Sequence, residues 1–306
     1  MAKNLFFVGI ILAAAGLLSP PLALAAGLAY GLLIAHPFQA ESKRLSHFLL
    51  QASVVCLGFG MNLAEVLKAG RSGFLYTAVG ISFALGLGWL LGRALKVGQT
   101  QSFLISAGTA ICGGSAIAAL GPVSNANEEE MAVSMGTVFV LNSVALFLFP
   151  FVGARLHLSQ SQFGLWSALA IHDTSSVVGA AAKYGAIALA VGTTVKLARA
   201  LWIVPVSMAT AALTKSKAKV RLPWFIVLFC IAAVINSYLP VLHPASLELS
   251  RLGKLGLAVT LFLIGTGISR QTVRQVGVRP MIQGLVLWII VGTGSLAAIC
   301  AGWIRL

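Results

Sequence analysis

The feature that most constrains this chain is a succession of apolar segments that are each long enough to cross a membrane. A bilayer core roughly 30 Å thick needs about 20 apolar residues per helix. About eleven segments can be traced, at 5–18, 21–36, 47–66, 73–94, 102–121, 130–153, 163–182, 185–213, 223–240, 252–269 and 281–304. The sequence therefore predicts an all-α polytopic membrane protein of about 11 transmembrane helices, with residues 1–306 as one membrane domain.

Charge supports this class of protein, because only 9% of the residues are charged and the mean hydropathy is +0.96. The net charge of +14 comes from residues scattered between the segments, which does not favour nucleic acid as a partner. The positive-inside rule places the N-terminus in the cytoplasm. Basic residues expected on that side are Lys3, Lys43, Arg44, Arg93, Lys96, Arg155, Lys215, Lys217, Lys219, Arg221, Arg270, Arg274 and Arg279. Those expected on the other side are Lys68, Arg71, Lys183, Arg251, Lys254 and Arg305.

Motifs for enzymes, metal sites and cofactors are not found in the sequence. Cys56, Cys112, Cys230 and Cys300 are far apart and show no CxxC spacing, which argues against a disulfide framework or a zinc site. No HExxH, GxSxG or P-loop motif occurs, so we expect neither an enzyme nor a bound cofactor. The N-terminus imitates a secretory signal, but the many later apolar segments favour an uncleaved first helix.

Two pairs of similar internal stretches, called echoes, interrupt the apolar segments with small and polar residues. "LGFGMN" at 57–62 is answered by "IGTGIS" at 264–269, and "AICGGSAIAA" at 110–119 by "AIHDTSSVVGAA" at 170–181. Irregular backbone at membrane depth is tolerated only inside protein or beside a watery cavity, and it often marks a carrier's substrate site. The first pair predicts broken helices at Gly58, Gly60, Asn62, Gly265 and Gly267.

The glycine-rich echo predicts a helix break at Gly113 and Gly114, beside Cys112 and Ser115. A half-helix beginning near Ser115 would direct its free N–H groups toward the membrane interior, where they could bind an anion. The alternative is that the glycines only permit close packing of helices. For the acidic run at 128–130, a cap on the following helix and a vestibule for cations both remain open.

The second echo places ionisable residues within an apolar segment, which indicates a functional site. In a continuous helix His172, Ser175 and Ser176 would share one face, whereas after a break Asp173 would cap the next turn, which begins at Thr174. Both geometries stay open. These residues and the CGGS stretch form the predicted substrate site, and Asp173 or His172 would carry the coupling proton.

Lys196 and Arg199 in the next segment are the predicted partners of this site. A buried charge needs a partner, and an ion pair of Asp173 with either cation would supply one. Arg199 could also bind an oxyanion, and Lys196 could balance charge. A purely structural ion pair, or cations that reach an interface, are the alternatives.

Taken in order, "LGFGMNL", "CGGS", "HDTSSV", "KLARALWIVPV" and "GTGI" resemble the YeiH-type family of bacterial inner-membrane proteins, which are often labelled sulfate exporters. That family is similar to the bile acid:sodium symporter and cation:proton antiporter superfamily. The resemblance implies an inverted-repeat carrier with panel and core domains, crossing broken helices, elevator-type alternating access and homodimers. The approximate repeats would be 21–153 and 163–304. The chain lacks the symporters' glutamate-glycine-x-glutamine-asparagine motif, which favours proton over sodium coupling.

These observations predict a secondary transporter of a small anion, with sulfate or a related oxyanion as the substrate that the resemblance implies. A sodium/proton antiporter or a sodium-coupled organic anion symporter is the first alternative, with Asp173 as the ion ligand. A channel or a membrane receptor without transport is the second.

Overall fold

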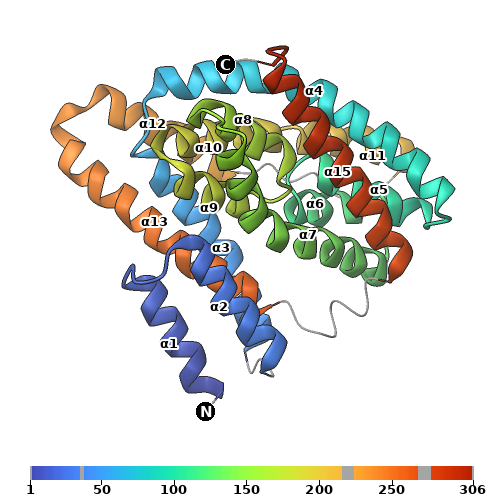
Figure 1. Cartoon of the computed structure of the whole chain (residues 1–306), viewed down its shortest axis with the longest axis horizontal. Helices are drawn as coiled ribbons and strands as arrows, with labels where there is room; N and C mark the ends of the chain where they lie inside the picture. Colours follow the sequence, from blue (N-terminus) through green and yellow to red (C-terminus); the bar gives the residue numbers. More distant parts are fainter. Residues whose placement is uncertain (1, 35–37, 216–223, 268–276, 305–306) are drawn as a thin grey trace. The chain divides into compact units, whose positions relative to one another are not determined.

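A computed structural model describes residues 2–34, 38–215, 224–267 and 277–304, and within these ranges the chain is helical without a strand (Figure 1). The chain divides into two compact units. Unit 1 comprises Met1–Lys68 and Pro223–Arg270, and unit 2 comprises Ala69–Leu222 and Gln271–Leu306. The predicted all-helical class is confirmed.

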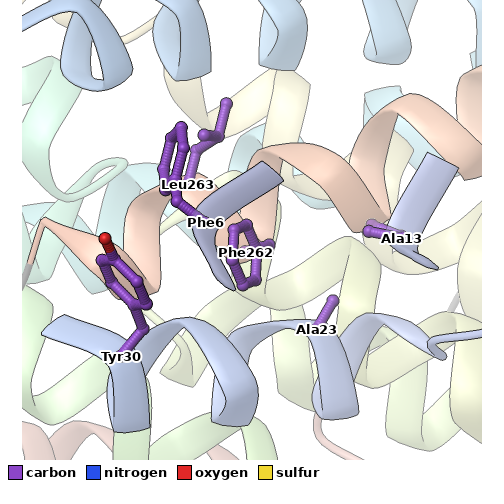
Figure 2. Packing of buried hydrophobic residues seen from close by; sticks show 7 residues of the cluster. Phe6, Ala13, Ala23, Tyr30, Phe262 and Leu263 are labelled. Carbon is purple, nitrogen blue, oxygen red and sulfur yellow. The ribbon is translucent and has the colours of Figure 1, made fainter. Parts of the chain in front are cut away.

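Unit 1 is built around its last long helix. Its elements are α1 (Ala2–Ala14), α2 (Pro20–Leu33), α3 (Gln39–Gly58), α12 (Trp224–Tyr238), the short 3-10 helix η1 (Pro240–Leu242) and α13 (His243–Thr266). Phe6 of α1, Tyr30 of α2 and Phe262 of α13 pack together (Figure 2). The Phe6 ring centroid lies 5.9 Å from that of Tyr30 and 6.1 Å from that of Phe262. Aromatic packing of this kind explains why the apolar first helix is held in the unit.

Unit 2 contains the remaining helices. They are α4 (Leu63–Ala94), whose first turns belong to unit 1, α5 (Gln99–Ala110), α6 (Gly114–Val123), α7 (Glu128–Arg155), α8 (Gln160–Ala170), α9 (Thr174–Tyr184), α10 (Ala186–Ala200), α11 (Ile203–Thr214) and α15 (Val278–Cys300). The helix α7 begins with a capping box, in which Asn127 accepts from the Glu130 N–H at 2.8 Å and the Glu130 carboxylate accepts from the Asn127 N–H at 3.0 Å. This confirms the interpretation of the acidic run as a cap.

Fewer helices than expected are long enough to span a membrane. In the described part of the chain, four qualify by length and composition: Tyr76–Ala94, Glu128–Arg155, Ala186–Thr214 and Val278–Cys300. A fifth is obtained if α12 and α13, which are bent by 104°, form one span. The count of eleven is therefore not confirmed. One reason is that two of the expected spans, 102–121 and 163–182, are divided into pairs of short helices.

The first of these pairs, α5 and α6, folds back on itself and is called hairpin A, residues 99–123. A Cβ atom on Gly108 of α5 would lie 2.9 Å from Cδ1 of Ile117 in α6. In a straight segment these residues would be about 13 Å apart along the axis. The reversal takes place at Gly113, whose φ of 67° is accessible mainly to glycine.

The second pair, α8 and α9, forms hairpin B, residues 160–184. The rings of Phe163 in α8 and Tyr184 in α9 stack with centroids 3.8 Å apart, and the Tyr184 hydroxyl donates to the Leu158 carbonyl at 2.7 Å. The end of α9 therefore returns to the start of α8. The predicted spans 102–121 and 163–182 are therefore wrong, because the chain reverses at each break, and the expectation of crossing broken helices is not confirmed.

The helix α7 connects the bases of the two hairpins. Hairpin A ends at Val123, with four residues between it and the start of α7, and hairpin B begins at Gln160, shortly after α7 ends at Arg155. With 28 residues, α7 is about 42 Å long. The hairpins therefore enter unit 2 from opposite ends of α7 and extend toward its middle.

This arrangement corrects one part of the predicted charge distribution. Arg155 and Lys183 were expected on opposite sides of the membrane, yet Tyr184 beside Lys183 bonds to Leu158 just beyond α7. Both basic residues lie at the same end of α7, because the 163–182 segment does not cross. The position of the N-terminus relative to a membrane stays a prediction.

Candidate functional site

The tips of the two hairpins meet inside unit 2. A Cβ atom on Gly113 of hairpin A would lie 3.3 Å from Cα and 3.4 Å from Cβ of Asp173 in hairpin B. It would also lie 3.3 Å from Cγ1 of Val138 in α7. Only a residue without a side chain allows this approach at the φ of Gly113. The structure therefore brings the glycine-rich and the ionisable echo together, which their separation in sequence does not reveal.

The tip of hairpin A carries no charged group. Cys112 is buried, and the Ser115 hydroxyl donates to the Cys112 carbonyl at 3.0 Å. Gly114 faces the Phe139 ring, since a Cβ there would lie 2.8 Å from Cζ. The helix α6 begins without a side-chain cap. Its first N–H groups have no partners within the helix, so the positive end of its dipole is directed to the meeting point of the tips.

The tip of hairpin B is capped by side chains. Asp173 accepts from the Ser175 N–H at 3.1 Å and from the Ser175 hydroxyl, so it is the N-cap of α9. Thr174, Ser175 and Ser176 are buried in its first turn. Of the two predicted geometries, the helix broken after Asp173 is the observed one.

Lys196 and Arg199 of α10 are buried, with 0% and 2% of their surface exposed, so they do not reach an interface. Their hydrogen bonds go to the carboxyl ends of α5 and α8, where main-chain carbonyls lack partners in their own helices. Lys196 donates to the carbonyls of Ile171 at 2.7 Å and Ala168 at 3.4 Å. Arg199 donates to those of Thr109, Ala110, Ala168 and Leu169.

The predicted direct ion pair of Asp173 with Lys196 or Arg199 is replaced by a different arrangement. Both cations bond to the negative ends of helix dipoles, whereas Asp173 bonds at the positive end of α9. Arg199 contacts both hairpins and therefore ties the two tips together. Each charge is compensated by main-chain groups, which is how a buried charge avoids the cost of losing water.

Sequence reasoning missed Asn142, which lies halfway along α7 and is only 4% exposed. Its Oδ1 accepts from the main-chain N–H groups of His172 at 3.1 Å and Asp173 at 3.3 Å, and thereby holds the break between α8 and α9. Its Nδ2 atom has no partner. The only signal in the sequence is a single amide within the apolar "VFVLNSVALF".

His172 is buried with 1% of its surface exposed. The Val138 carbonyl is the nearest main-chain acceptor of its ring, although neither ring nitrogen forms a hydrogen bond of regular geometry. The His172 and Trp288 ring centroids are 6.3 Å apart, and Trp288 Nε1 donates to the Ala170 carbonyl at 3.0 Å. Thus two polar side chains at the break, those of His172 and Asn142, retain unused hydrogen-bonding groups.

The remaining predicted site residues belong to unit 1, whereas the hairpin tips belong to unit 2. Gly58 ends α3, and a Cβ there would lie 2.6 Å from the Phe229 carbonyl oxygen. Asn62 accepts from the Ala64 N–H at 2.8 Å as α4 begins. Gly265 is inside α13, where a Cβ would lie 2.7 Å from the Leu24 carbonyl oxygen.

Two further glycines complete this group. A Cβ on Gly60 would collide with Ser250, and Gly267 is the C-cap residue of α13. A helix break does occur between Gly58, where α3 ends, and Leu63, where α4 begins. The expectation of a break is wrong for Gly265, which lies inside α13 and permits close packing instead. Among the described residues no group of three or more His, Cys, Asp or Glu side chains could hold a metal ion.

Comparison with known proteins gives consistent matches along the chain. The sequence model of the family described as Conserved hypothetical protein 698 matches residues 6–284. UPF0324 membrane protein GSU2818 of Geobacter sulfurreducens is 52% identical over 92% of this chain and 91% of its own length. UPF0324 membrane protein Bd1437 of Bdellovibrio bacteriovorus is 46% identical over 100% of this chain and 96% of its own. A UPF0324 membrane protein of Bacteroides thetaiotaomicron is 47% identical over 92% and 86%.

Proposed function

Because the chain belongs to the family described as Conserved hypothetical protein 698, a YeiH-like family whose named relatives are membrane proteins, we propose that it is a secondary active transporter of a small anion. Its place would be the bacterial inner membrane. Sulfate or a related oxyanion is the first substrate to test, and the site would act by binding and not by enzymatic chemistry.

The meeting of the two hairpin tips is the observation that carries this proposal. Each hairpin brings irregular backbone and polar groups from one end of α7 to its middle. A chain in lipid tolerates irregular backbone only where it is buried in protein or lines a cavity, and carriers place their sites near the bilayer midplane in this way. The tips therefore supply a binding site that each side of the membrane could reach in turn.

The charges around the tips favour an anion. Two basic side chains, Lys196 and Arg199, lie here against one acidic side chain, Asp173, and the N-terminus of α6 adds a partial positive charge without a side-chain cap. An anion at this end of α6 would lie beside Asp173. Since two negative charges so close repel each other, a proton on Asp173 would favour binding of the anion. This gives proton coupling a physical basis.

The division of the chain into two compact units supports an elevator-type mechanism, in which the unit that contains both hairpins moves as a body. The second candidate is a sodium/proton antiporter, which is favoured by the buried carboxylate of Asp173. Such a protein would exchange sodium in a pH-dependent manner and would not respond to sulfate.

The test begins with a thermal-shift screen of the detergent-solubilised protein against sulfate, phosphate, nitrate, acetate and sodium, because a ligand of the native state raises the apparent stability. The anion with the largest shift is then used in proteoliposomes with an imposed pH gradient. We expect the wild type to accumulate it and Asp173→Asn to lose the gradient-driven accumulation, because Asn cannot exchange a proton.

Glu129→Gln is the matched control, since it removes a negative charge from the exposed start of α7. It should transport like the wild type. If no anion binds or moves, or if Asp173→Asn also behaves like the wild type, the proposal is wrong in its substrate class or its coupling.

A further inference from the structure

We propose that Asn142 is a substrate ligand, which together with His172 binds the oxygen atoms of a small oxyanion through neutral N–H groups. The inference rests on the proposed transport function and deepens it, because it concerns how an anion is selected at the hairpin tips. Asn142 is not among the residues that the sequence motifs single out.

The orientation of the Asn142 amide follows from its partners. Its Oδ1 accepts from two main-chain N–H groups, those of His172 at 3.1 Å and Asp173 at 3.3 Å. The opposite orientation would set an NH₂ group against two donors, so it is excluded by chemistry. The amide is therefore fixed, and its Nδ2 keeps two N–H donors without a partner.

The position of Nδ2 is limited by the size of the amide. Nδ2 and Oδ1 belong to one planar group, so Nδ2 is within roughly 6 Å of both main-chain nitrogens at the break between α8 and α9. The ring nitrogens of His172, at the same break, are also buried and form no hydrogen bond of regular geometry, the nearest main-chain acceptor being the Val138 carbonyl. Buried polar groups are nearly always satisfied in native proteins, and an exception calls for an explanation such as a bound ion.

The unused groups fit an anion and not a cation. A hard cation such as sodium or calcium needs oxygen ligands, but Asn142 Oδ1 already accepts two hydrogen bonds, and among the described residues no group of three His, Cys, Asp or Glu side chains could hold another metal. An oxyanion offers only acceptors, and it matches the two Nδ2 donors and the N–H of a neutral imidazole. Arg199 and Lys196 are bonded to main-chain carbonyls, so we assign them as positioning residues.

The variant Asn142→Asp separates ligand binding from a structural role. An aspartate keeps an oxygen that accepts from the His172 and Asp173 N–H groups, so the break remains capped, but it replaces the NH₂ donor with a negative charge. We expect at least a tenfold increase in the dissociation constant for the anion found in the screen, measured by isothermal titration at pH 8. Lowering the pH to 5 should restore part of the affinity, because a protonated carboxyl again offers a donor.

The control is Asn127→Asp, which makes the same substitution at the N-cap of the same helix, where Asp and Asn are equally suitable. Its affinity should equal that of the wild type at both pH values. If Asn142→Asp is not recovered as a folded protein, Asn142→Ser replaces it, because the hydroxyl can still accept at the break but lacks the amide donors.

The outcomes distinguish this inference from the proposed function. If the wild type binds none of the anions, the proposed function is wrong and the role of Asn142 falls with it. If the wild type binds an anion and the Asn142 variant binds it equally well, Asn142 is only structural. The same conclusion follows if Asn142→Asp binds the anion more weakly by a factor that does not change with pH relative to the wild type.

Discussion

The two hairpin tips reach the same place by different chemistry. Hairpin A reverses through Gly113, with a φ of 67°, and the following helix α6 has no side-chain cap. Hairpin B reverses through extended residues that are held by hydrogen bonds, with Asp173 as the cap of α9 and Asn142 as the acceptor for the break. A chain can thus shape buried irregular backbone either by removing side chains or by adding polar ones.

Because of this difference, the two tips contribute different chemical groups to the candidate binding site. Hairpin A leaves space and a positive helix end, whereas hairpin B supplies a carboxylate, an imidazole and hydroxyl groups. Arg199 connects the two by donating to carbonyls at the end of α5 and at the end of α8. The comparison can be tested by replacing first Arg199, which contacts both hairpins, and then residues that belong to one tip only.

Replacing the shared element should have the largest effect on stability. Arg199→Ala leaves three main-chain carbonyls from both hairpins, those of Thr109, Ala110 and Leu169, without their charged donor, whereas the Ala168 carbonyl keeps Lys196. Because each unsatisfied buried group costs about 1–3 kcal/mol, we expect the free energy of unfolding to fall by at least about 3 kcal/mol. The measurement is the shift in the unfolding midpoint in detergent.

Arg155→Ala is the matched control for this substitution. Arg155 is exposed at the end of α7, and its guanidinium carbon lies 5.0 Å from the centre of the Phe151 ring. An exposed cation over a ring contributes only about 0.5–1 kcal/mol. Equal losses in the two variants would show that Arg199 does not hold the tips together.

Gly113→Ala affects hairpin A alone and should have an intermediate effect. The added methyl group meets Asp173 and Val138 at 3.3 Å, and a non-glycine residue at this φ is strained. We expect a loss of about 1–3 kcal/mol in the free energy of unfolding. Gly80→Ala in α4 is the control, because a Cβ there meets nothing within 4 Å and alanine favours a helix. A neutral Gly113→Ala would contradict the glycine-dependent reversal.

Sequence reasoning predicted the break at Gly113 and offered the break after Asp173 as one of two geometries, because the causes of both are local. Adjacent glycines at 113 and 114 weaken a helix, and Asp173 before hydroxyl residues is typical of an N-cap. The direction of the chain after each break depends on contacts such as Phe163 with Tyr184, which are 21 positions apart. For this reason each pair of short helices was predicted as one span, and these two spans are not formed.

The hydrogen-bond partners of the buried ionisable side chains could not be predicted from the sequence either. Opposite charges suggest an ion pair, but unpaired main-chain carbonyls at helix ends can replace it, and residue types do not reveal which carbonyls these are. Asn142 was missed for a related reason, since its acceptors and donors matter only once α7 lies beside the break. Gly265 looked like a helix break, yet it is the close approach of α2 that requires a glycine there.

The smallest expected difference lies between one serine of each tip. In hairpin B the Ser175 hydroxyl donates to the carboxyl group of Asp173, and in hairpin A the Ser115 hydroxyl donates to the Cys112 carbonyl. Hydrogen bonds to charged groups contribute about 1.5–3 kcal/mol and neutral ones about 0.5–1.5 kcal/mol. Ser175→Ala should therefore lower the free energy of unfolding by about 1 kcal/mol more than Ser115→Ala, measured in parallel by chemical unfolding. Equal losses would mean that Asp173 is uncharged in the folded protein under those conditions, and hairpin B would then differ from hairpin A in geometry but not in electrostatics.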